Sequence, residues 1–126
     1  MLGFLGHLPP DSIIYLRRGL RTNAGPFEQL VSRLATTLGL SYRYHLPVPH
    51  SGRAAVYNRD IAMVAESDLV VAFFAPARIM EGGTAHVVEK AIDAAVPVFA
   101  YAIHQDGRIE RVGEWEDPRL AEWDLP

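Results

Sequence analysis

The segment from Asp68 to Glu89 restricts the possible fold of this 126-residue chain more than any other segment. Leu69 to Phe74 is an uninterrupted apolar run that predicts a buried strand, and residues 75–83 form a loop that ends in Gly82-Gly83. A helical pattern then begins at Thr84. Glycines at a helix N-terminus let an anion approach amides that have no partner within the helix. The segment therefore predicts a strand–loop–helix anion site, although the glycine pair alone fits a tight turn equally well.

Strand and helix patterns alternate along the rest of the chain. Short β-branched and aromatic runs predict strands, and apolar residues repeated at a spacing of three and four predict helices. The expected strands are 12–16, 40–46, 69–74 and 96–103, with a short hairpin arm at 108–112, and the expected helices are 26–38, 54–66 and one from 84 onward. The expected inward faces of these helices are Phe27, Leu30, Val31, Leu34, Ala35 and Leu38, then Tyr57, Ile61, Val64 and Ala65, then Val87, Val88, Ala91, Ile92 and Ala95.

This alternation predicts an α/β fold, namely a three-layer, Rossmann-like open parallel sheet of about four to five strands. The length fits one domain, residues 1–126. Residues 1–11 are expected to be an N-terminal arm, either packed on the body, paired as a strand or facing a partner. Residues 113–126, with Trp115 and Trp123, are expected to be a capping tail.

Composition excludes several classes of function. The net charge of −3 argues against broad nucleic-acid binding, which needs a basic surface. There is no cysteine, and the histidines are scattered, so we predict no metal site and no cofactor. The first residues lack the basic region of a secretory signal, and no apolar run approaches the roughly 20 residues of a membrane span. We therefore expect a cytoplasmic chain with no membrane partner.

The predicted fold gathers three loops at one edge of the sheet. Ligands bind beyond the carboxyl ends of parallel strands, where the loops 17–23, 45–53 and 75–84 would meet. Some of the arginines in the first loop are expected to face the anion and the others to be solvated. Thr84 fits a helix cap or a phosphate contact, and His86 fits an exposed polar residue or a proton-transfer group. The expected ligand-binding residues are Arg17, Arg18, Arg21, Arg59, Gly82, Gly83, Thr84 and His86.

Four short motifs resemble those of a known family of proteins: Tyr57–Asp60, Ser67–Phe73, Gly82–His86 and Val96–Val98. Their order, over residues 53–103, is similar to that of the SLOG superfamily of Rossmann-like nucleotide-binding domains. That superfamily includes the phosphoribohydrolases once called lysine decarboxylases, and the same order is similar to that of nucleoside 2-deoxyribosyltransferases. The resemblance implies a nucleotide or nucleoside ligand and a homo-oligomer.

One residue departs from the pattern of both enzyme groups. They carry a glutamate three residues after the Gly-Thr step, where this chain has Val87. Glu89 lies two residues further on, and two residues turn a helix by about 200°, so Glu89 is expected to point elsewhere. The catalytic residue is therefore unassigned, with Glu81, Glu89 and Asp60 as the candidate carboxylates.

We predict a nucleotide-binding domain, because the expected carboxylate is missing. The alternative is an enzyme of the N-glycosidic bond, similar to a nucleoside deoxyribosyltransferase or a nucleotide phosphoribohydrolase. A third possibility is a scaffold protein without a small ligand.

Overall fold

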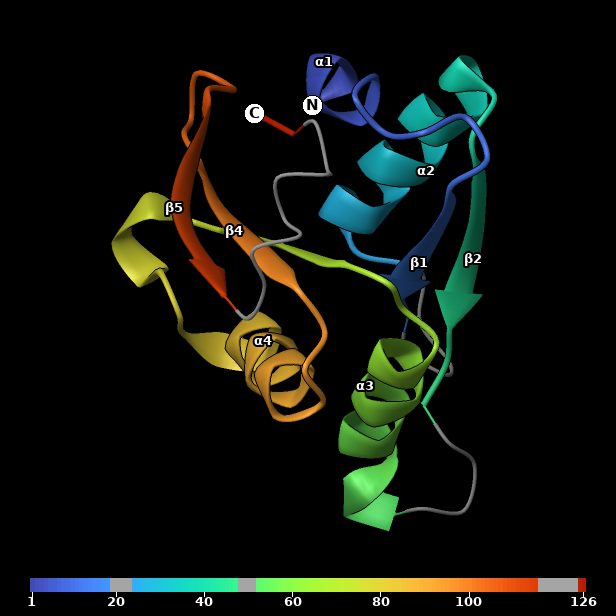
Figure 1. Cartoon of the computed structure of the whole chain (residues 1–126), viewed down its shortest axis with the longest axis vertical. Coiled ribbons are helices and arrows are strands. Elements are labelled where there is room, and N and C mark those ends of the chain that lie inside the picture. Colours follow the sequence, from blue (N-terminus) through green and yellow to red (C-terminus); the bar gives the residue numbers. More distant parts are fainter. Residues whose placement is uncertain (19–23, 48–51, 116–124) are drawn as a thin grey trace. The chain divides into compact units, whose positions relative to one another are not determined.

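The computed structural model describes residues 1–18, 24–47, 52–115 and 125–126, which belong to two compact units. The first unit comprises residues 1–63 together with Leu125, and the second begins at Val64. Each unit contains two parallel strands that are joined through a helix (Figure 1). The α/β class predicted from the sequence is therefore confirmed.

In the first unit, β1 and β2 are parallel neighbours. The pairing runs from Ile13 opposite Ser41 to Arg17 opposite His45. The helix α2 connects the two strands and packs on β2, and α1 packs against α2 (Figure 1). The elements of this unit are α1 (Leu2–Leu5), β1 (Ile13–Arg17), α2 (Pro26–Leu38), β2 (Ser41–His45), the short 3-10 helix η1 (Gly52–Ala54) and α3 (Ala55–Ala65), whose last two residues, Val64 and Ala65, are assigned to the second unit.

The predicted limits of α2 are confirmed. Pro26 is its first residue, where the missing N–H has no helical partner to lose. Gly39 ends the helix with a φ of +73°, and the Leu40 N–H donates to the Ala35 carbonyl at 2.9 Å, as in a Schellman motif. The predicted inward face is correct for Val31 and Ala35, which are buried, but wrong for Leu30 and Leu38, which are exposed.

The N-terminal arm packs within its own unit. Residues 2–5 form α1, and the side chains of Phe4 and Leu5 are buried. Of the roles considered for residues 1–11, the structure therefore favours packing.

The predicted inward face of α3 is correct for Val64 but wrong for Tyr57, Ile61 and Ala65, which are exposed. Tyr57 and Ile61 are 55% and 46% exposed, whereas Arg59, Asp60, Met63 and Val64 are buried. A count of apolar residues misses this face because it contains two charged side chains. Arg59 and Asp60 are ion-paired with each other, and this pairing compensates for part of the cost of burying them.

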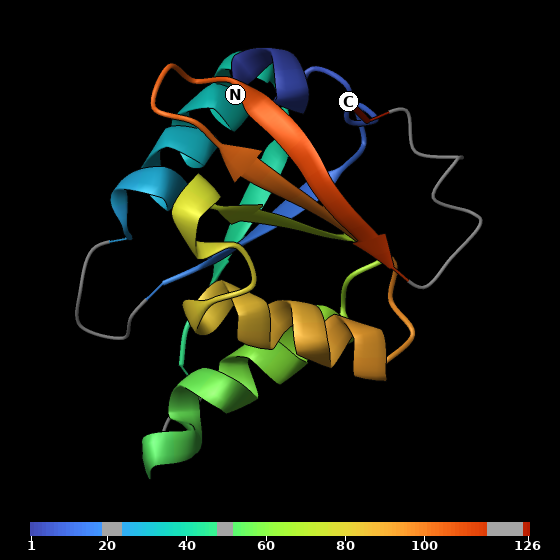
Figure 2. The same ribbon diagram turned by 90° about the vertical axis from the view of Figure 1, so that its left-hand side faces the viewer.

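The second unit is a three-stranded sheet with one helix along a face. Strand β4 is central, parallel to β3 and antiparallel to β5, and α4 packs on β3 and β4 (Figure 2). Residues 98–102 of β4 are completely or almost completely buried. The elements are β3 (Val70–Phe74), the 3-10 helix η2 (Pro76–Arg78), α4 (Gly82–Asp93), β4 (Val98–Ile103) and β5 (Ile109–Trp115).

Strand β5 contains a break in its register with β4, and the side chain of Arg111 beside this break lies over two aromatic residues of β4. Ala100 is opposite Gly113 but Tyr101 is opposite Arg111, so β5 carries one extra residue at this point. The Arg111 guanidinium lies 4.4 Å from the ring centroid of Phe99 and forms an ion pair with Glu114 at 3.2 Å. Phe73 of β3 stacks on Tyr101, with the ring centroids 5.7 Å apart.

Among the described residues, the strands pair as two sheets, β1-β2 and β3-β4-β5, and the antiparallel pairing of β5 with β4 confirms the hairpin arm predicted at 108–112. The predicted bounds of two elements need correction. Residues 113–115, expected in the tail, belong to β5, and residues 116–124, including Trp123, lie outside the described residues. Helix α4 ends at Asp93, so Ala95 lies beyond it and is exposed. No helix in the described part of the chain is long and apolar enough to cross a membrane.

Candidate functional site

The N-terminus of α4 is the strongest candidate site in the second unit. The helix begins at Gly82, two residues before Thr84, where the sequence pattern predicted its start. Gly82 has a φ of +75°, which a residue with a side chain rarely adopts. No described atom lies within 4 Å of the place where a Cβ on Gly82 would stand, apart from the adjoining backbone. The start of the helix is therefore open on the side of Gly82.

The loop before the helix carries backbone strain and an ion pair. Met80 has a φ of +61°, an uncommon conformation for a residue other than glycine. Glu81 caps the helix only through its extended backbone, because its side chain makes no capping hydrogen bond. Strained residues of this kind occur often at functional sites, which favours a functional role for this loop.

The carboxylate of Glu81 is paired instead with Arg78, at 3.1 Å between Nε and Oε2. The two side chains are 73% and 57% exposed, so their pairing contributes little to stability and can be exchanged for other partners. Arg78 was missed in the sequence analysis. The available signal was that it is the one basic residue in the loop between β3 and the glycine pair.

The next residues of α4 point in different directions. Thr84 and His86 are half-buried, and each makes contacts within the protein. Val87 is buried, whereas Glu89 is exposed. The position where the two enzyme groups that the sequence resembles carry a glutamate thus faces the packed interior, and the nearest following carboxylate faces outward.

The three candidate carboxylates have different environments. Asp60 belongs to the first unit, is 1% exposed and accepts hydrogen bonds from Arg59. Glu81 and Glu89 belong to the second unit and are exposed. Among the described residues, no three His, Asp or Glu side chains are grouped as a metal ion would require.

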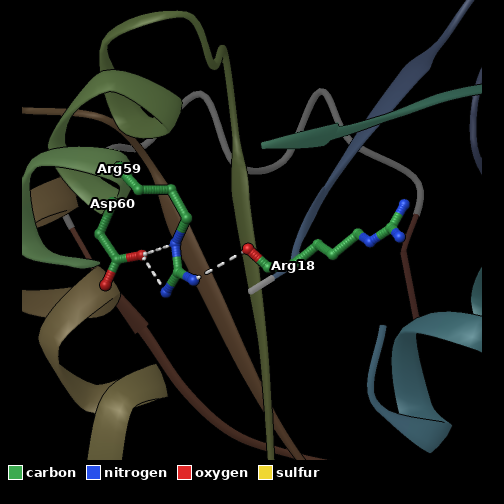
Figure 3. Close-up of polar contacts among 3 residues, drawn as sticks. All are labelled: Arg18, Arg59 and Asp60. Atoms are coloured by element: carbon green, nitrogen blue, oxygen red, sulfur yellow. Dashed lines mark hydrogen bonds and ion pairs between the residues drawn. The ribbon is translucent and has the colours of Figure 1, made fainter. Parts of the chain in front are cut away.

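The predicted arginines of the first unit lie around the end of β1. Arg17 is its last residue, and the next residue, Arg18, donates its N–H to the His45 carbonyl at 3.0 Å. The carbonyl of Arg18 faces Arg59, whereas its side chain extends away from Arg59 (Figure 3). The guanidinium of Arg18 lies 5.9 Å from the ring centroid of Tyr44. Arg21 lies outside the described residues.

Comparisons with models of protein families, with curated proteins and with solved structures found no match to this chain. The resemblance to the SLOG superfamily therefore stays a prediction from the sequence, and the function has to be argued from the site.

Proposed function

We propose that this chain binds a nucleotide or a nucleotide-derived ligand and holds a phosphate of that ligand at the Gly82-Gly83-Thr84 start of α4. The conformation of Gly82 carries the proposal. Its positive φ and the empty space at its Cβ position would allow a phosphate oxygen to reach the first amides of the helix. The partial positive charge of a helix N-terminus favours such an anion.

Arg78 would supply the matching charge. Because its pairing with Glu81 is exposed, Arg78 can turn from the carboxylate to a phosphate at little cost. Glu81 would then act against binding, since its negative charge stands beside the phosphate. The prediction that Arg17, Arg18 and Arg21 also contact the ligand concerns the first unit, and it stays a prediction.

The environment of the carboxylates favours binding over catalysis. A carboxylate that attacks or stabilises an anomeric carbon must touch it. Val87 occupies the expected position and is buried, Glu89 is exposed, and Asp60 is paired with Arg59. Cleavage of the N-glycosidic bond is therefore the second candidate, and the assay below separates the two.

The proposal includes a Rossmann-like, three-layer fold of the SLOG type. The strand–helix–strand connections β1-α2-β2 and β3-α4-β4 support it, because they are the repeat from which such folds are built. A crystal structure of the protein would test the fold. We also propose a homo-oligomer in the cytoplasm. A monomer mass by light scattering at all concentrations, or recovery in another cell fraction, would contradict these parts.

Calorimetry with nucleosides, nucleoside monophosphates and inorganic phosphate tests the binding site. We expect monophosphates to bind more tightly than nucleosides. We expect Gly83→Val to weaken binding about tenfold or more, because the new side chain occupies the space of the phosphate. Arg78→Ala should also weaken binding and Glu81→Gln should strengthen it, whereas Arg108→Ala, in the exposed β4–β5 turn, serves as the control.

Three results would contradict the proposal. If no member of the panel binds, or if Gly83→Val binds normally, the glycine pair is only a turn. Chromatography of the same mixtures detects free base. Base release that is abolished by Glu81→Ala or Glu89→Ala would replace the binding function with the enzymatic one.

A further inference from the structure

The ion pair between Arg59 and Asp60 is buried, and burial of an ion pair does not by itself stabilise a fold. Nε and Nη2 of Arg59 donate to the same oxygen, Oδ1 of Asp60, at 3.0 and 2.9 Å. The two residues are 8% and 1% exposed. Replacing a buried ion pair with well-packed apolar side chains is often neutral or stabilising, because the charges lose their hydration. Some other property of the pair has to explain its place in the fold.

The contact of the remaining guanidinium nitrogen, Nη1, suggests what the pair does in the fold. Nη1 of Arg59 donates to the carbonyl of Arg18 at 3.5 Å (Figure 3). The backbone N–H of Arg18 donates to the carbonyl of His45 at 3.0 Å. The backbone of Arg18 is therefore held from both sides, by β2 through its N–H and by α3 through its carbonyl.

A guanidinium is suited to this double contact. Its donors are fixed in one plane, so Asp60 can orient the group while the remaining arm reaches the Arg18 carbonyl. An ammonium group is a compact charge on a flexible stem and lacks this fixed fork. The side chain of Arg18 takes no part in the contact and extends away from it (Figure 3).

We infer that Arg59 is a positioning residue that fixes the backbone at the carboxyl end of β1, and that Asp60 orients its guanidinium for this purpose. Through this contact, α3 sets where the side chains of Arg17 and Arg18 leave the strand. Any anion that these two arginines bind would then depend on Arg59 without touching it. The inference concerns the first unit and goes beyond the phosphate site proposed for α4.

Amide hydrogen exchange of Arg18 tests the inference directly. In the double variant Arg59→Met, Asp60→Leu, we expect this amide to exchange about tenfold faster or more, because the same residue loses the contact at its carbonyl and opens more easily. The melting temperature of the same variant shows whether it stays folded at the temperature of the exchange measurement. The amide of Leu40, bonded to the Ala35 carbonyl at the end of α2, is the internal control and should not change.

The variant Arg59→Lys tests whether the planar arrangement of the guanidinium donors is needed. It also replaces the double variant in the test if the double variant does not fold. Lysine keeps the charge beside Asp60 but not the planar arrangement, so we expect fast exchange at Arg18 and normal exchange at Leu40. Unchanged exchange at Arg18 in Arg59→Lys, or in a folded double variant, would overturn the inference. Faster exchange at both amides would also overturn it, since the pair would then be a general stabiliser.

Calorimetry with pyrophosphate extends the test to the arginines. We expect the folded double variant to bind pyrophosphate more weakly than the natural protein, and binding of equal strength would contradict the link to Arg17 and Arg18. The exchange readout is separate from the α4 site, and the pyrophosphate titration is made separate by carrying Gly83→Val in both proteins. If Gly83→Val has no effect on nucleotide binding, the proposed function fails while the exchange result for Arg18 stands.

Discussion

Gly113 lies against the outer edge of the Trp115 ring, so that a Cβ on Gly113 would stand 2.6 Å from Cη2 of the tryptophan. Two further ring atoms would lie 3.1 Å away, so the ring has to move if position 113 gains a side chain. We expect Gly113→Ala to lower the free energy of unfolding by about 1 kcal/mol, the usual cost of forcing a side chain away from its preferred rotamer. Urea unfolding measures this change.

The role of the ring can be isolated in a double-mutant cycle. In a Trp115→Ala background, the Gly113→Ala change should cost much less, because the ring that it meets is absent. With Trp123 replaced by Phe, the fluorescence of Trp115 should shift to the red in the Gly113→Ala variant as the ring becomes more exposed. An equal cost in both backgrounds would show that the contact does not determine the residue at position 113.

Ala95, two residues beyond the end of α4, has a conformation that suits glycine better. Its φ is +56°, and the Val96 N–H bonds to the Ala91 carbonyl at 2.8 Å, as in a Schellman motif. We expect Ala95→Gly to raise the free energy of unfolding by about 0.5–1 kcal/mol, because relief of strain exceeds the added entropy of the unfolded chain. Ala94→Gly is the matched control. The φ of Ala94 is −90°, so glycine brings no relief there, and equal effects at both positions would contradict the explanation.

Tyr101 should make stability depend on pH in the alkaline range. Burial raises the pKa of its phenol above the usual value of about 10; Arg111 works against this shift and the charge of Glu114 adds to it. The unfolded chain therefore loses this proton at a lower pH than the folded protein. The contribution of Tyr101 is complete below about pH 10 and is lost as the pH rises toward the folded pKa.

The variant Tyr101→Phe should remove this part of the pH dependence. Urea unfolding at about pH 8 and about pH 11 gives the loss of stability for each protein, and we expect a smaller loss for the variant. The other titrating groups are the same in both proteins and cancel in the comparison. Equal losses would mean that the phenol ionises alike in the folded and unfolded chains.

The comparison of sequence and structure shows which patterns carry information. The limits of α2 were predictable because Pro26 and Gly39 act locally, through a missing N–H and a positive φ. The buried face of α3 was predictable only at Val64, because a periodicity of apolar residues cannot reveal two charges that are buried against each other. The strain at Met80 and Ala95 was equally hidden, since neither residue type signals a left-handed backbone.

The candidate site was predictable only where a local sequence signal marks it. The glycine pair marks the start of α4 to within two residues, but the sequence does not say which glycine takes the positive φ. Arg59 could be selected as a candidate from the Tyr57–Asp60 motif, but its contact with the Arg18 carbonyl could not be predicted. That contact joins residues 41 positions apart and depends on the packing of α3 within its unit.

Gly82 can be tested for its backbone conformation apart from any ligand. A Cβ at this position meets no described atom within 4 Å, so Gly82→Ala creates no steric clash beyond its own backbone. Its φ of +75° should nevertheless make alanine costly, and we expect a loss of about 1 kcal/mol in the free energy of unfolding. Gly3→Ala in α1 is the matched control, because its Cβ would also meet open space, without a positive φ. That change should be neutral or slightly stabilising, as alanine favours helices. If both variants keep full stability, the left-handed conformation at the start of α4 is not required by the fold.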